Sequence, residues 1–172
     1  IQNFNERSDL GLSLILDSRL SKYNLPEQKG EEDKSFGKKV VVLGQVDNDA
    51  SIKYGNPDGW STFDLIKLAS YENLGCEVLY RPHPEVYKGY QKSSIVSERI
   101  ERYAKLVSPE TSLVDTLQSA SRVYTISSLS GLEALIRGKE VVVVGSPFYA
   151  GWGLTDDRSI NVRRSRKLTL SE

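Results

Sequence analysis

Side chains able to do chemistry gather at four places in the chain, each directly after a short apolar run. The first, GQVDNDASI (44–52), follows KKVVVL and holds the carboxylates of Asp47 and Asp49 beside Gln45. An ionised carboxylate in a cleft can serve as a nucleophile, a base or a metal ligand. Spacing alone favours a simpler reading, in which Asp and Asn stabilise turns and cap the next helix. A calcium loop is set aside, because its glycine and distal glutamate do not stand at the required positions.

The second cluster, RPHP (81–84), contains His83, the one histidine of the chain, between two prolines that stiffen its backbone. An imidazole placed there can donate a hydrogen bond to a phosphate oxygen or supply a proton. Arg81 suits an anionic ligand such as phosphate or carboxylate. The competing interpretation is a loop histidine whose hydrogen bonds are satisfied within the protein.

The third cluster, TISSLSG (125–131), opens a helix with Ser127, Ser128, Ser130 and Gly131. Hydroxyls beside the free N–H groups and positive end of a helix form an anion site. Capping alone requires only one of these serines. Glu133 lies just inside the same helix, where it either joins the cap or accepts a hydrogen bond from a ribose hydroxyl.

The fourth cluster, SPFYAGWGLT (146–155), interleaves aromatic residues with glycines. Such a loop either packs against a neighbouring domain or closes over a base or sugar. Together, four polar clusters after four apolar runs indicate a cleft for an anionic ligand. The chain has neither GxGxxG nor GxxxxGK[ST], which argues against a standard dinucleotide site or P-loop.

The elements that must position these clusters alternate from Lys38 onward. Strands are expected at 39–44, 76–81, 122–127 and 141–145, and helices at 62–74, 94–106, 112–120 and 129–138. Continuous β-branched runs such as KVVVLG are typical of strands buried on both faces. The alternation predicts an α/β fold with a doubly wound, Rossmann-like parallel sheet. Ligands in such folds bind outside the carboxyl ends of the strands, where each polar cluster falls.

The chain divides into three expected parts. Residues 1–37 comprise a helical stretch (8–26) and a charged linker (27–37), residues 38–157 form the Rossmann-like domain, and residues 158–172 form a basic segment. The basic segment is interpreted as a solvated surface or interdomain face rather than a membrane contact. The absence of methionine suggests a fragment of a longer protein or a trimmed one.

Composition narrows the function classes. Twenty-three basic residues balance twenty-three acidic ones, which argues against nucleic-acid binding. Cys76, the one cysteine, excludes an internal disulfide, suits a reducing compartment and is expected to be a packed core thiol. No apolar run approaches the roughly 20 residues of a membrane span, and no secretory signal opens the chain. We expect a cytoplasmic protein.

GQVDNDASI, YRPHPEV, SSLSGLEALIRGK and GSPFYAGWGLTDD, in that order and spacing, resemble the capsule polysaccharide biosynthesis proteins of the KpsC type. These are retaining β-Kdo glycosyltransferases, and the resemblance covers about residues 38–157. It implies transfer of Kdo from CMP-β-Kdo to a sugar hydroxyl of a capsule or lipopolysaccharide glycan. It also implies the C-terminal, donor-binding half of a GT-B-like enzyme, which acts without a metal or cofactor.

The resemblance also implies residue roles. Asp49 would form a covalent glycosyl intermediate, with Asp47 placed second, and His83 would donate to the donor phosphate. The remaining expected substrate contacts are Gln45, Arg81, Ser127, Ser128, Ser130, Gly131 and Glu133. The implied partners are the CMP-sugar, a glycan or glycolipid acceptor, and an N-terminal Rossmann-like half. A peripheral position at the inner face of the bacterial inner membrane is compatible with that role.

Two alternatives remain at this point. The chain could be a nucleotide-binding half-domain that performs no chemistry without its partner half. It could also belong to an inverting transferase of the CMP-sialic acid type, because His-Pro and Ser/Thr elements of this kind occur there too.

Overall fold

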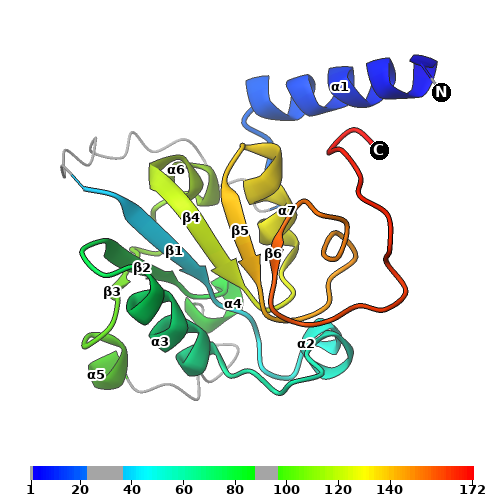
Figure 1. The fold of residues 1–172 in the computed structure, drawn as a ribbon. Helices are drawn as coiled ribbons and strands as arrows, with labels where there is room; N and C mark the ends of the chain where they lie inside the picture. The colour runs from blue at the N-terminus through cyan, green and yellow to red at the C-terminus, as the bar shows by residue number, and fades with distance from the viewer. Residues whose placement is uncertain (1, 23–36, 88–96) are drawn as a thin grey trace.

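The computed structural model describes residues 2–22, 37–87 and 97–172 (Figure 1). Its centre is a sheet in which every pair of neighbouring strands is parallel, in the order β3-β2-β1-β4-β5-β6. The strands are β1 (Lys39–Leu43), β2 (Glu77–Arg81), β3 (Lys105–Leu106), β4 (Ala120–Thr125), β5 (Glu140–Val143) and β6 (Asp156–Asp157). This order is that of the doubly wound dinucleotide-binding fold, so the predicted fold class is confirmed.

Both faces of the sheet are covered, as the β-branched runs predict. Along β1, Val40 and Val42 face one core cluster while Val41 and Leu43 face the other, and all four are at most 4% exposed. The first cluster packs under Leu65 and Ile66, and the second packs under helices that follow β3 and β4. Alternate residues of one strand therefore serve two hydrophobic layers.

Helices supply those layers (Figure 1). The helices are α1 (Gln2–Asp17), α2 (Ala50–Gly55), α3 (Thr62–Glu72), α4 (Pro84–Tyr87), α5 (Ser97–Ile100), α6 (Leu113–Ser119) and α7 (Leu129–Ile136). Three of them begin with a serine whose side chain accepts a backbone N–H of the first turn: Ser61 before α3, Ser112 before α6 and Ser128 before α7. These caps fix where each crossover helix starts, just beyond the carboxyl edge of the sheet.

Two expectations about elements require correction. The helix predicted over 94–106 is described only as α5, since residues 94–96 lie outside the described residues and Lys105–Leu106 form β3. Ile100 and Ala104 are buried against the α3 layer, so tertiary packing accounts for apolar positions that resemble a longer helix. The short elements α2, α4, β3 and β6 were not predicted, because two to six residues carry too little periodicity.

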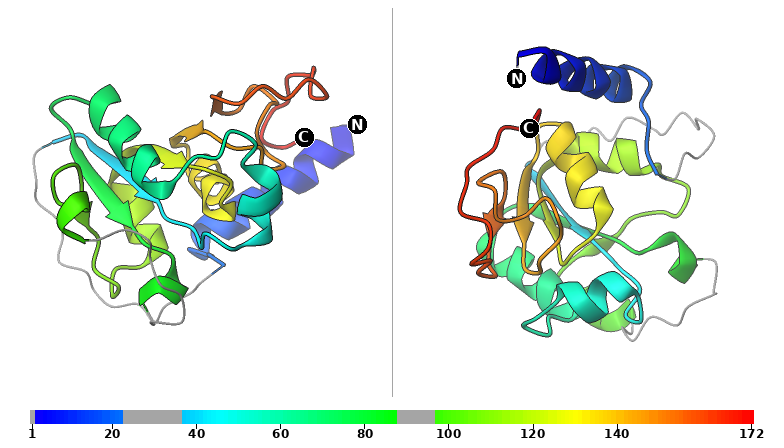
Figure 2. Two further views of the ribbon diagram at one scale, coloured as in Figure 1. Left: turned by 90° about the horizontal axis from the view of Figure 1, so that it is seen from below. Right: turned by 90° about the vertical axis from the view of Figure 1, so that its right-hand side faces the viewer.

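The N-terminal helix ends earlier than predicted. α1 stops at Asp17 rather than before Pro26, and Arg19 takes a left-handed backbone conformation with φ of 49°. The Arg19 guanidinium donates to Asp115 and Gln118 of α6, which stabilises this turn. Figure 2 shows α1 lying apart from the layers of the sheet domain. Over the described ranges, no helix combines the length and apolarity needed to cross a bilayer.

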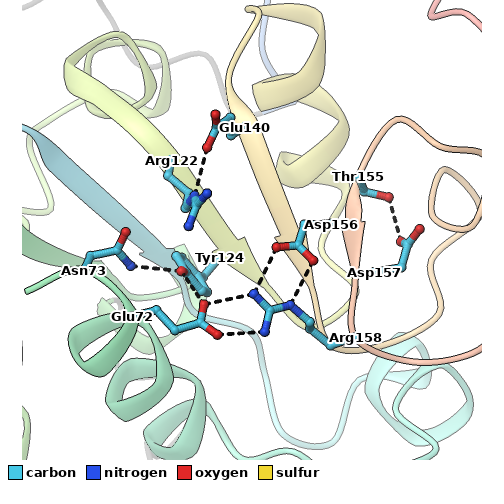
Figure 3. Close-up of polar contacts among 9 residues, drawn as sticks. All are labelled: Glu72, Asn73, Arg122, Tyr124, Glu140, Thr155, Asp156, Asp157 and Arg158. Carbon is cyan, nitrogen blue, oxygen red and sulfur yellow. Dashed lines mark hydrogen bonds and ion pairs between the residues drawn. The ribbon is translucent and has the colours of Figure 1, made fainter.

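The segment that carries β6 is attached to the sheet domain by a polar cluster (Figure 3). Arg158 donates to Glu72 at 2.7 and 3.0 Å and to Asp156 at 2.9 Å. The hydroxyl of Tyr124 donates to Glu72 at 2.7 Å and accepts from Asn73 at 2.9 Å. The end of α3, the carboxyl-terminal part of β4 and the final strand are thereby joined in one network.

Candidate active site

The four polar clusters meet at one cleft of about 490 Å³. It lies where the loops after β1, β2, β4 and β5 meet, and β1 and β4 are the neighbours between which the strand order reverses. Doubly wound folds bind ligands at this switch point. Seven expected site residues line the cleft: Gln45, Asp49, Arg81, His83, Ser127, Ser128 and Ser130.

Gln45 ties the two sides of the switch point together. Its side-chain oxygen accepts the backbone N–H of Ser127 at 2.8 Å, and its Nε2 donates to the Ser127 hydroxyl at 3.1 Å. Nε2 also lies 3.3 Å from the hydroxyl of Ser51. The amide therefore holds the β1 loop against the β4 loop, and it reaches Asp49 through Ser51 rather than directly.

Asp49 combines both interpretations of the opening cluster. It is the N-cap of α2, where it accepts the backbone N–H of Ser51 at 2.7 Å, and its exposed carboxylate also lines the cleft. Hydrogen bonds from the side chain and backbone of Ser51 hold the pKa of Asp49 below its ordinary value. The carboxylate is consequently ionised at neutral pH, as a nucleophile or an electrostatic stabiliser requires.

His83 is held as a neutral imidazole with a defined tautomer. Its Nδ1 accepts the backbone N–H of Glu85 at 3.3 Å, which leaves the ring proton on Nε2. Partial burial lowers the pKa of His83, and the Lys22 ammonium acts in the same direction. The charges of Glu85 and Asp49 oppose this shift. At neutral pH the ring can therefore donate through Nε2–H without carrying a positive charge.

Arg81 is anchored inside the protein. It is 8% exposed, and its guanidinium donates to the carbonyl of Thr111 at 2.7 Å and to the hydroxyl of Thr116 at 3.0 Å. These bonds tie the end of β2 to α6. The side chain still lines the cleft, where its positive charge would attract a bound anion.

The serines divide into two groups. Ser127 is buried, its hydroxyl donates to the carbonyl of Ser51 at 3.1 Å, and Gln45 occupies both its hydroxyl and its N–H. Ser127 therefore positions the loop. Ser128 caps α7 by accepting the N–H of Ser130 at 3.2 Å, and both residues line the cleft beside the helix N-terminus. Ser128 and Ser130 are the better placed for an anion.

Gly131 and Glu133 are not among the residues that line the cleft. Gly131 is buried beneath the ring of Tyr149, where an added Cβ would collide with the phenol and come within 3.0 Å of Thr125. Glu133 points toward the N-terminal segment, where it accepts the backbone N–H of Lys22 at 3.3 Å and lies 3.9 Å from Arg137. The predicted ribose contact by Glu133 thus has no support in this geometry.

Lys22, Tyr54 and Phe148 are three of the lining residues that were not among the expected site residues. Lys22 comes from the stretch 8–26 that was expected to be helical, Tyr54 from the unpredicted helix α2, and Phe148 from the loop after β5. Of these three, only Phe148 could have been expected from the sequence, because it lies in the run rich in aromatic residues and glycines (146–155). Lys22 carried no local signal, because its position depends on contacts of residues 19–22 with α6 and α7.

Comparison with known proteins identifies the family. The model of the family described as capsule polysaccharide biosynthesis protein matches residues 14–171. This chain belongs to that family. The match includes every strand of the sheet and each loop that lines the cleft.

Relatives in this family include proteins of surface polysaccharide metabolism. The chain is 41% identical over 169 residues to the lipopolysaccharide-processing protein LpsZ of Rhizobium meliloti. It is 38% identical over 173 residues to the capsule polysaccharide modification protein LipA of Neisseria meningitidis serogroup B. The matches span 97% and 98% of this chain but only 38% and 25% of those proteins' own lengths.

Two solved structures of Thermosulfurimonas dismutans KpsC share the fold. The structure described as a beta Kdo 2,4 transferase superposes with a TM-score of 0.85 at 34% identity, and the one described as a beta Kdo 2,7 transferase with 0.79 at 32%. Each match covers 99% of this chain and 54% or 52% of the other. The chain is thus a Rossmann-like unit that spans about half of each of these structures, and the predicted KpsC-type resemblance is confirmed.

Proposed function

We propose that this chain is the donor-binding half of a retaining β-Kdo glycosyltransferase that takes Kdo from CMP-β-Kdo. The observation that carries the proposal is the ionised Asp49 carboxylate in the same cleft as His83 and the α7 N-terminus. Double displacement on a glycosyl donor with a phosphate leaving group needs a carboxylate on one side of the anomeric carbon and phosphate-binding groups on the other. Family membership and the KpsC neighbours support Kdo as the sugar.

In the first step, an oxygen of Asp49 attacks the anomeric carbon of Kdo. The bond from that carbon to the phosphate oxygen breaks, and CMP leaves with the electron pair. His83 donates its Nε2–H to the departing phosphate, while Ser128, Ser130 and the end of α7 stabilise its negative charge. Because CMP is a good leaving group, stabilising its charge matters more than protonating it.

In the second step, the acceptor hydroxyl attacks the same carbon from the face that CMP vacated. The bond to Asp49 breaks, the carboxylate is regenerated, and the hydroxyl proton passes to a base on the acceptor side. Two inversions give net retention. Gln45 contributes by holding Ser51 and Ser127, and thereby the walls that carry Asp49 and the phosphate site.

The first step needs only the donor site, so it can be tested on this chain. Incubation with CMP-Kdo, followed by intact-protein mass spectrometry, should show one Kdo added to the unchanged chain. Asp49→Ala should abolish the adduct. Asp47→Ala is the matched control, since Asp47 is an exposed carboxylate two residues away that does not line the cleft, and it should retain the adduct. An adduct that persists in Asp49→Ala, or a product of inverted configuration, would contradict this mechanism.

A second candidate function is a nucleotide-binding module that is inactive without its partner half. It is favoured by the fact that the chain spans about half of the KpsC structures it matches. CMP binding that His83→Ala weakens, combined with no adduct from CMP-Kdo, would favour this candidate.

A further inference from the structure

Phe148 is an exposed aromatic side chain on the lining of the candidate active site. It follows β5 in the run Ser146–Ala150 and is 63% exposed, whereas its neighbours Tyr149 and Ala150 are buried. A single exposed phenylalanine needs no explanation by itself. Its position in a polar cleft, on a loop that the protein holds firmly, makes it significant.

Several contacts hold the backbone around Phe148. The guanidinium of Arg164 donates to the carbonyls of Pro147 and Ala150 and lies over the ring of Trp152, 5.6 Å from its centroid. The indole N–H of Trp152 donates to the carbonyl of Phe148 at 2.7 Å. The backbone carbonyls of Pro147, Phe148 and Ala150 therefore all accept hydrogen bonds, which restrict the backbone that carries the Phe148 ring.

The ring is also coupled to the phosphate side of the cleft. Phe148 packs edge-to-face on Tyr149, with centroids 5.5 Å apart, and the Tyr149 hydroxyl donates to the carbonyl of Ser128. Tyr149 in turn lies over Gly131 of α7, where no Cβ would fit. The cap of α7 and the ring of Phe148 therefore belong to one packed unit.

We propose that Phe148 is the platform on which the nucleobase of the donor stacks while Ser128 and Ser130 hold its phosphate. This rests on the proposed function, in which the donor is a CMP-sugar. An aromatic face accepts any base face and contributes affinity without reading base edges. Of the other two aromatic residues with six-membered rings in the lining, Tyr149 is buried. Tyr54 is a weaker candidate because the Lys53 ammonium lies over its ring, 5.3 Å from the centroid.

The test compares ligands that differ by the base alone. Calorimetry on this chain would measure CMP and ribose 5-phosphate against the unchanged protein, Phe148→Ala and Phe148→Tyr. Phe148→Ala should weaken CMP binding by roughly tenfold while ribose 5-phosphate changes less than about twofold, and Phe148→Tyr should restore CMP binding. Tyr71→Ala is the control, because Tyr71 is an exposed aromatic of α3 that does not line the cleft.

The outcomes separate this inference from the proposed function. If the unchanged chain binds CMP and Phe148→Ala binds it equally well, the ring is not a base platform and instead suits packing against another part of the enzyme. If Phe148→Ala weakens both ligands alike, the residue acts on the phosphate site. If the unchanged chain binds neither ligand, the proposed function fails and this inference fails with it. Thermal unfolding of each variant checks that the fold is retained.

Discussion

Asp49 and His83 are held in the protonation states that the proposed first step requires. Hydrogen bonds from Ser51 keep the Asp49 carboxylate ionised, and burial keeps the imidazole neutral with its proton on Nε2. Lys22 contributes a positive charge that lowers the pKa of both groups. These local contacts favour a nucleophilic carboxylate and a neutral donor at neutral pH.

Because His83 is the one histidine of the chain, its titration can be followed directly by NMR. We expect the pKa of His83 to lie below the ordinary value of 6.5. Lys22→Gln should raise it, since an opposing positive charge is removed, and Asp49→Asn should lower it further, since a favourable negative charge is removed. Shifts of the same sign in both variants would contradict the placement of these groups around the imidazole.

The lowered pKa of His83 also makes stability depend on pH. The unfolded chain binds a proton at His83 more readily than the folded one, so stability rises with pH in this range. The stabilising contribution is fully present above 6.5 and is lost as the pH falls through the lower folded pKa. Urea unfolding between pH 7.5 and pH 5.5 should show a smaller loss for His83→Gln than for the unchanged chain.

At the scale of elements, α2 is held against the strand ends by close backbone contacts. The N–H of Ser146 donates to the carbonyl of Gly55 at 2.7 Å, and Gly55 lies against Ser127. A Cβ at Gly145 would approach the carbonyl of Ile126 to 2.6 Å and collide with that of Gly55. The absence of a side chain at Gly145 therefore sets how closely α2, and with it Asp49, approaches the β4 loop.

Gly145→Ala should lower the free energy of unfolding by about 1–3 kcal/mol, because the obstructing atoms are backbone carbonyls that cannot rotate away. Urea denaturation measures the loss. Gly11→Ala is the control, since Gly11 lies within α1 with nothing within 4 Å of the added carbon, and alanine favours a helix interior. Equal stability of the two variants would contradict the close approach at Gly145.

Arg158 plays a corresponding role for the last strand. Its guanidinium group donates to Glu72 of α3 and to Asp156 of β6 (Figure 3). The two carboxylates, Asp156 first, raise the pKa of Arg158. Lysine cannot make both paired contacts. Since the side chain is 32% exposed, we expect Arg158→Lys to cost only about 0.5–1 kcal/mol, and less at high salt. Arg163→Lys, in an exposed residue of the C-terminal segment, should leave the denaturation midpoint unchanged.

At the scale of the whole molecule, the cleft of this chain lies at the switch point of a single sheet. The residues described in its lining come from the ends of β1 and β2, from the loops and short helical segments that follow the strands at the carboxyl edge, or from the segment after α1. The KpsC structures are about twice as long as the matched region. In the proposed function, acceptor binding and the base that deprotonates the acceptor therefore belong to another part of the enzyme.

We accordingly expect this chain to bind CMP but not to complete transfer on its own. Calorimetry should detect CMP binding, and His83→Ala should weaken it because a donor to the phosphate is lost. Incubation with CMP-Kdo and a Kdo-containing acceptor should yield no disaccharide product by mass spectrometry. Sustained product formation by the isolated chain would contradict this division of labour.

The sequence was sufficient for those features that depend on local pattern. The runs around Val40–Leu43, Val78–Arg81, Arg122–Thr125 and Val141–Val143 alternate with amphipathic helices, and burial on both faces of a parallel sheet demands continuous apolar residues. The ends of those strands then placed the polar clusters at one edge, and seven of nine expected site residues line the cleft there.

Tertiary structure alone decided which of these side chains line the cleft and which form hydrogen bonds that hold its walls. Gln45 and Ser127 hydrogen-bond to each other, and Arg81 donates to Thr111, so these side chains join segments far apart in sequence. Glu133 accepts the backbone N–H of Lys22. Such contacts depend on how helices dock on the sheet, so no spacing within the chain encodes them. For Asp49, the sequence favoured a turn or capping role without predicting α2, and only the tertiary structure showed that the same carboxylate both caps α2 and lines the cleft.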